Sequence, residues 1–181
     1  MASIAKFDQW YTTAGIPRET IVQAKQTHLT TRYTQSIPGS VATDITNLNV
    51  AITPATTNSR ILLFGRWTGE YGASDRSWDS VWGFKRSGTR IGDATEPGST
   101  LIYGMGLSGL TYYGDDINST SDSMTIFYID SPATTSEITY SIYTLTQTAH
   151  TLYTNRTAGW ANQSTGHELT TSTIIAMEIT G

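Results

Sequence analysis

The sequence predicts an all-β protein folded as an antiparallel, jelly-roll-like β-sandwich. Apolar and polar residues alternate along short segments, and turn-forming Gly, Pro, Asp and Ser recur about every ten residues. Threonine, with 33 copies, is β-branched and suits a half-exposed pleated surface. Charged residues make up only 14% of the chain, whereas an average soluble domain has about 25%. Hydroxyl groups rather than charges therefore cover the expected sheets.

Residues 1–19 differ from the rest of the chain. They carry the aromatic residues Phe7, Trp10 and Tyr11, followed by a Gly-Ile-Pro turn signal at 15–17. At most two turns of helix are expected, in residues 3–10. Because so short a segment cannot bury its own aromatic rings, we expect it to dock on the main domain or to insert into another protein. Residues 20–181 are expected to form the β-sandwich domain.

The first half of that domain predicts six strands. Residues 44–53 alternate, with their apolar members at Ile45, Leu48, Val50 and Ile52, and end at a proline. Residues 60–70 are expected to be the most buried strand, because positions 61–64 are continuously apolar. A Ser-Gly turn at 87–88 predicts a hairpin. The six expected strands are 20–27, 30–36, 44–53, 60–70, 80–86 and 89–92.

The second half predicts further strands of the same kind. Residues 100–113 contain three glycines among apolar residues and favour a bent or bulged strand pair. The last expected strand ends two residues before Gly181, so we expect the C-terminus to be tied into a sheet. The other expected strands are 123–130, 137–145, 151–155 and 172–179.

Composition argues against several classes of partner. The net charge is −4, and the 11 Lys and Arg residues are scattered, so we expect no nucleic-acid partner and no binding to an anionic membrane. No apolar run approaches the ~20 residues of a membrane span, and we expect no membrane insertion. The first residues lack the apolar core of a signal peptide, which indicates synthesis and assembly in a cytoplasm.

Candidate chemical groups do not form a recognisable active site. The three histidines, His28, His150 and His167, lack metal-ligand spacing, and there are no cysteines. Asp115 and Asp116 are expected at a loop tip, where hard oxygen ligands could alternatively contact calcium or another ligand. A G-x-G-x-x-G pattern at 104–109 lacks the helix that a phosphate site needs. We therefore expect no enzyme, no cofactor and no metal site.

Aromatic residues are the more informative candidates. Trp67 and Trp82 lie on alternating strands and are expected in the core. Trp78 and Trp160 are flanked by Ser, Asp, Gly and Asn and are harder to bury. Exposed aromatic rings stack on sugars and anchor interfaces. The candidate receptor or interface residues are Trp78, Tyr112, Tyr113, Asp115, Asp116 and Trp160.

Several motifs, in order, resemble one family of proteins. Trp10, Gly15, Arg18 and Gln23 follow the pattern W-x4-G-x2-R-x4-Q, and a segment L-x-V-x-I-T-P runs over residues 48–54 and continues to S-x-I-L at 59–62. Further matching segments are 83–93, 128–132 and 172–179. This arrangement resembles the fibre-type virion proteins of tailed marine and cyanobacterial phages. The aromatic-rich stretches at 68–80 and 98–118 depart from the family pattern.

The resemblance implies a virion structural protein, displayed on a tail or head as a homotrimer. It implies attachment to other virion proteins through Phe7, Trp10 and Tyr11, with distant loops facing the host and possible contact with a surface glycan. Two alternatives stay open: a capsid decoration or cement protein, and a carbohydrate-binding module.

Overall fold

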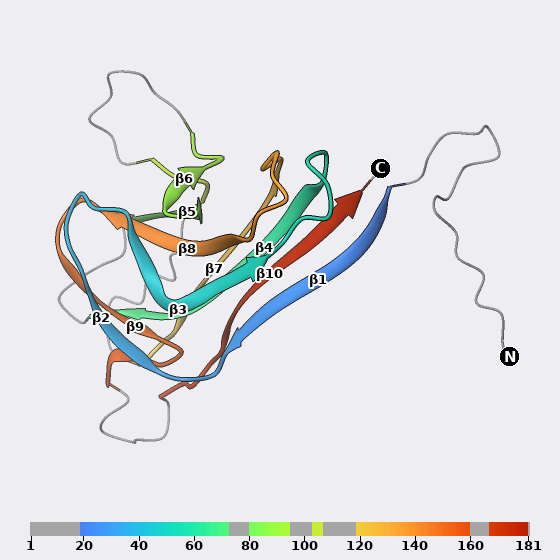
Figure 1. The fold of residues 1–181 in the computed structure, drawn as a ribbon. Coiled ribbons are helices and arrows are strands. Elements are labelled where there is room, and N and C mark those ends of the chain that lie inside the picture. Colours follow the sequence, from blue (N-terminus) through green and yellow to red (C-terminus); the bar gives the residue numbers. More distant parts are fainter. Residues whose placement is uncertain (1–18, 73–79, 95–102, 107–118, 160–166, 181) are drawn as a thin grey trace, which may run out of the picture.

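A computed structural model describes residues 19–72, 80–94, 103–106, 119–159 and 167–180, and within them the chain forms ten strands and no α-helix (Figure 1). Among the described residues, no helix is long and apolar enough to cross a membrane. The strands are β1 (Thr20–Leu29), β2 (Tyr33–Ile37), β3 (Thr43–Ile52), β4 (Arg60–Tyr71), β5 (Ser80–Arg86), β6 (Thr89–Ile91), β7 (Asp122–Asp130), β8 (Ile138–Thr146), β9 (His150–Thr154) and β10 (Ser172–Thr180).

The strands form two antiparallel sheets, which confirms the predicted β-sandwich. The first sheet has the order β1-β10-β4-β9-β2, with β7 paired on the other edge of β4. The second sheet has the order β3-β8-β5-β6. When the short β2–β9 pair is set aside, eight strands remain in two groups of four, β1-β10-β4-β7 and β3-β8-β5-β6. That interleaving of early and late strands is the order of a jelly roll.

Most strand predictions agree with the structure to within a few residues. The predicted strand at 30–36 begins later, at Tyr33, because residues 30–32 form the bend between β1 and β2. Of the strand pair predicted at 100–113, only residues 103–106 are described, and there Gly106 makes a single bridge to Trp82. The short helix predicted at 3–10 lies outside the described residues.

The core lies between the two sheets. Its largest fully buried side chains include Trp67 and Trp82, whose rings stack with centroids 4.6 Å apart, so the predicted burial of both is confirmed. Gly65 lies on the core face of β4, where an added Cβ would come within 2.7 Å of Ile142 Cδ1. The absence of a side chain at this position lets Ile142 and Phe84 pack directly against the backbone of β4.

The outer faces of the two sheets differ. On the second sheet, β6 and the residues after it cover Tyr143 of β8: Arg90 Nε donates to Tyr143 Oη at 3.0 Å, and Tyr143 Oη donates to Asp93 Oδ1 at 2.6 Å. The first sheet has no such cover among the described residues, and Phe64 on β4 is 41% exposed. The apolar run at 61–64 is therefore not buried throughout. Ile61 and Leu63 face the core, whereas Leu62 and Phe64 face outward.

Strand β4 also defines two ends of the domain. At its first residue, Arg60 pairs with Glu19, which directly precedes β1. Its last residue, Tyr71, pairs with Leu152 of β9. Twelve residues in a strand span roughly 40 Å, so the start of β1 and the end of β4 lie at opposite ends of the sandwich (Figure 1).

Candidate functional site

The sequence-predicted site residues lie outside the described part of the chain. This holds for the attachment residues Phe7, Trp10 and Tyr11, and for the receptor or interface candidates Trp78, Tyr112, Tyr113, Asp115, Asp116 and Trp160. The structure does describe the residues that flank their segments. We call these flanking residues, 68–72, 119–122, 155–159 and 167–172, the loop end.

Two carboxylates tie the flanks of the three candidate segments together. Glu168, which follows segment 160–166, accepts a hydrogen bond from the backbone N of Ser121 at 2.6 Å, and Ser121 follows segment 107–118. Glu70, which precedes segment 73–79, accepts one from the backbone N of Ala158 at 2.6 Å. Because a carboxylate strengthens a backbone hydrogen bond, each contact fixes one flank to another. The structure thus brings described flanks of the three segments to one end of the sandwich.

Asn155 organises the same end from within. Its Nδ2 donates to the carbonyls of Leu29 and Thr31, both at 2.8 Å, and its Oδ1 accepts from Ser172 Oγ at 2.6 Å. The residue is fully buried and has a φ of 63°, which Asn tolerates better than most residues. The backbone therefore turns sharply after β9, and the turn is joined to the ends of β1 and β10.

Buried aromatic rings pack together in the core next to the loop end. Trp67 Nε1 donates to Thr154 Oγ1 at 3.0 Å, and the Tyr71 ring packs edge-on against the Trp82 ring at 6.4 Å. Burial raises the pKa of Tyr71 to about 12, although its hydrogen bond with Thr144 acts in the opposite direction. Tyr71 is therefore neutral at physiological pH and serves as a packing and hydrogen-bonding group.

The histidines do not meet in a metal site. His28 is exposed on β1 and contacts Thr173, His150 lies edge-on to Tyr71 at 5.6 Å, and His167 lies 3.3 Å from Thr157 Oγ1. Among the described residues, no three His, Asp or Glu side chains are grouped closely enough to hold a metal ion. The described residues of the loop end therefore hold the flanking chain in place by hydrogen bonds.

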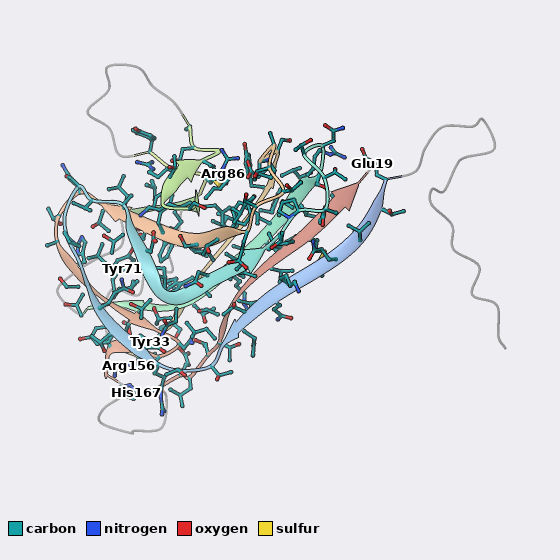
Figure 2. The ribbon with its side chains drawn as sticks, viewed as in Figure 1. Glu19, Tyr33, Tyr71, Arg86, Arg156 and His167 are labelled. Atoms are coloured by element: carbon teal, nitrogen blue, oxygen red, sulfur yellow. The ribbon has the colours of Figure 1, made fainter. Side chains whose placement is uncertain are left out.

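Sequence reasoning missed one exposed cluster beside this end. The Arg156 guanidinium lies over the Tyr153 ring, 4.6 Å from its centroid, and its Nη2 donates to Thr34 Oγ1 at 2.6 Å. Figure 2 shows Arg156, Tyr33 and His167 at the same end of the molecule, with Glu19 at the other. The spacing of three residues between Tyr153 and Arg156 does not predict a contact within a strand. The two side chains meet because the chain turns at Asn155.

A shallow pocket of about 340 Å³ lies elsewhere, beside the β5–β6 turn. Arg86 and Glu137 are its charged lining residues. Arg86 is already paired, since its Nη1 donates to both carboxylate oxygens of Asp130 at 3.1 Å. Asp130 also accepts from Tyr140 Oη at 2.6 Å, so this network acts as a structural cross-link between β5, β7 and β8.

The chain was also compared with known proteins. No protein-family model and no curated protein matches it.

Proposed function

We propose that this chain is a structural protein of a phage virion, a fibre or receptor-binding component of the tail or head. In this proposal residues 1–19 attach the protein to other virion proteins, the β-sandwich forms a homotrimer, and the segments at the loop end face the host. The proposal rests on the resemblance of the sequence motifs and assigns no enzymatic activity and no cofactor.

The observation that best supports the proposal is that the point where the chain enters the domain and the loop end lie at opposite ends of the sandwich. The chain enters the sandwich at Glu19, beside Arg60 at the first residue of β4. The candidate binding segments leave it at the loop end, roughly 40 Å away along the same strand. A displayed adhesin needs this separation, because the attached end must not obstruct the end that meets a receptor.

The fold is compatible with this function. Jelly rolls occur in viral capsid proteins and in lectin domains. Because one fold serves many functions, this is an argument by analogy only. The rigid loop end, held by Glu70, Glu168 and Asn155, would present short segments on a fixed base, as binding sites on scaffolded loops generally require.

A capsid decoration or cement protein is the nearest alternative. It would attach through the same residues and point the same end outward, but its loops would bind no receptor. A carbohydrate-binding module is the other, because exposed aromatic rings stack on sugars. An array of glycans probed with the protein and its Trp160→Ala and Tyr113→Ala variants separates an adhesin from a cement protein. Binding that both variants lose supports an adhesin, and absence of binding favours a cement protein.

Deletion of residues 1–18 tests the attachment role. The deletion keeps Glu19 and its ion pair with Arg60, so the sandwich is expected to keep its thermal stability. We expect the deleted protein to be missing from purified particles, whereas the Trp160→Ala variant is incorporated normally. Normal incorporation of the deleted protein would contradict the proposed attachment.

A further inference from the structure

The outer face of β7-β4-β10-β1 carries an apolar surface, which we call the outer patch. Its members alternate along each strand with residues that point into the core. Four of them are strongly exposed: Phe127 at 72%, Ile21 at 58%, Ile129 at 46% and Phe64 at 41%. The patch consists of Ile21, Ala24, Leu62, Phe64, Phe127, Ile129, Ile175, Met177 and Ile179.

The strand register makes the patch continuous. One row across the four strands is Ala24, Met177, Leu62 and Ile129. The next row is Gln26, Ile175, Phe64 and Phe127, in which the two Phe rings lie 6.5 Å apart. Seven of these eight side chains are apolar, and none is charged. A contiguous exposed apolar surface of a few hundred Å² often marks an interaction site.

Polar residues border the patch on both sides along the strands. On one side lies the row of His28, Thr173, Arg66 and Thr125. On the other side Ile179 pairs with Arg60, which is held by Glu19. An uncharged apolar centre with a polar rim is the composition of a protein interface, and a centre this apolar is typical of contacts between identical subunits.

The size of the face agrees with a stable subunit contact. Four strands spaced about 4.8 Å apart, over four rows about 6.7 Å apart, cover roughly 500 Å² in projection. Protruding side chains and the flanking residues add to that area, and a standard interface buries about 800 Å² on each partner. The face is also a regular sheet surface, which can pack on another sheet at about 10 Å.

We infer that the outer patch is the surface through which copies of this chain associate with one another. The second sheet differs, because Arg90 of β6 and Asp93 after it already cover Tyr143 on its outer face, and the outward residues of β3 form no comparable apolar surface. Around a threefold axis, the outer patches of three copies would face inward and enclose an apolar column. The inference depends on the proposed function only for the number three, and it gives that self-association a location.

Phe127→Glu tests the inference in the purified full-length protein. Phe127 is mostly exposed within one copy, so the variant should fold, as far-UV circular dichroism can verify. We expect the wild-type protein to sediment at about three times the mass of one chain. The carboxylate would lie unpaired in the interface, so the variant's dissociation constant should rise at least ~100-fold and the protein should sediment as a monomer.

Val41→Glu is the matched control, because Val41 is also an exposed apolar residue, at 51%, but lies between β2 and β3. This variant should keep the wild-type mass. A wild-type protein that is monomeric at tens of micromolar would overturn the inference, and so would a Phe127→Glu variant that stays oligomeric. A full-length protein that is monomeric and associates only after residues 1–18 are deleted would also overturn the inference, because residues 1–18 of the same chain would then be what covers the patch.

This experiment uses no virions, so its result is separate from the incorporation test. Association through the patch together with normal incorporation of the 1–18 deletion would contradict only the attachment proposal. Loss of incorporation in that deletion, with a monomeric wild-type protein, would contradict the inference about the patch and the proposed trimer but would leave the attachment proposal standing.

Discussion

Replacement of Glu178 by glutamine is expected to destabilise the domain by about 2 kcal/mol. Glu178 is fully buried on β10 and accepts three hydrogen bonds: from Ser59 Oγ at 2.5 Å, from the backbone N of Ala55 at 2.7 Å and from Gln23 Nε2 at 2.5 Å. The carboxylate thereby joins the loop after β3 to β1 and β10. A side-chain amide of the same shape can accept only with its oxygen, so at least one of the three donors loses its acceptor.

The magnitude follows from these contacts. A hydrogen bond to a charged group contributes about 1.5–3 kcal/mol and a neutral one about 1, so two retained bonds lose about 1 kcal/mol each. A donor left unpaired in the core adds about 1–3 kcal/mol. The neutral amide saves part of the cost of burying a charge, which reduces the net loss to about 2 kcal/mol. In a chain of this size that corresponds to a melting temperature about 4–8 °C lower.

The pH dependence provides an independent check. Burial of the Glu178 carboxylate raises its pKa, but the hydrogen bonds from Ser59, Gln23 and Ala55 outweigh burial, so the pKa is lowered overall. Its stabilisation is therefore complete above the unfolded-state pKa of about 4.3 and is lost as pH falls through the lower folded-state value. The difference in melting temperature between wild type and Glu178→Gln should be constant near neutral pH and shrink in acid.

Differential scanning calorimetry at one fixed protein concentration measures both effects, since concentration alters the melting temperature of an oligomer. Glu137→Gln is the control: Glu137 is exposed, and its substitution should change stability by less than about 0.5 kcal/mol. Equal melting temperatures for wild type and Glu178→Gln would refute the reasoning, as would a difference that persists unchanged at pH 3.

Two further substitutions test the packing and the loop end. Gly65→Ala should cost about 1–3 kcal/mol in urea denaturation, because its Cβ would lie 2.7 Å from Ile142 Cδ1, and unchanged stability would contradict the described core. Asn155→Ala should cost about 3 kcal/mol or more, since it removes three buried hydrogen bonds and places alanine at a φ of 63°. Asn155→Gly loses the same bonds without the backbone strain and should be about 1 kcal/mol more stable than Asn155→Ala, and the reverse order would contradict this account.

Local alternation was enough to predict the strands and the sandwich. Residues 44–53, for example, are expected and observed as a strand to within a residue, because alternating apolar residues give a strand one face that packs on a core. The burial of Trp67 and Trp82 followed from the same pattern.

Alternation could not tell which outer faces stay open. The apolar run at 61–64 is typical of a strand buried on both sides, yet Phe64 faces outward, beside apolar neighbours on β7 and β10. Nor could it predict a buried charge: on β10 the core face holds Ile174, Ala176 and Glu178, and the carboxylate is accommodated by donors from distant segments.

The convergence of the three candidate segments also required the topology. Glu70, Ser121, Ala158 and Glu168 are far apart in sequence, and they meet only because β4, β7, β9 and β10 share one sheet. The binding roles of Trp78, Tyr112, Tyr113 and Trp160, and the attachment role of Phe7, Trp10 and Tyr11, stay predictions.

The orientation of the displayed domain on the particle is tested most directly by labelling intact particles. The chain has no cysteine, so single substitutions give clean thiol sites. Leu169→Cys places a thiol at the loop end, where Leu169 is 54% exposed, and Thr57→Cys places an exposed one at the end where β1 begins. With a bulky maleimide reagent we expect the thiol at position 169 to react on particles as fast as on the free protein, and the thiol at position 57 to be slowed. Protection at position 169 with free reaction at position 57 would mean that the domain is mounted the other way round.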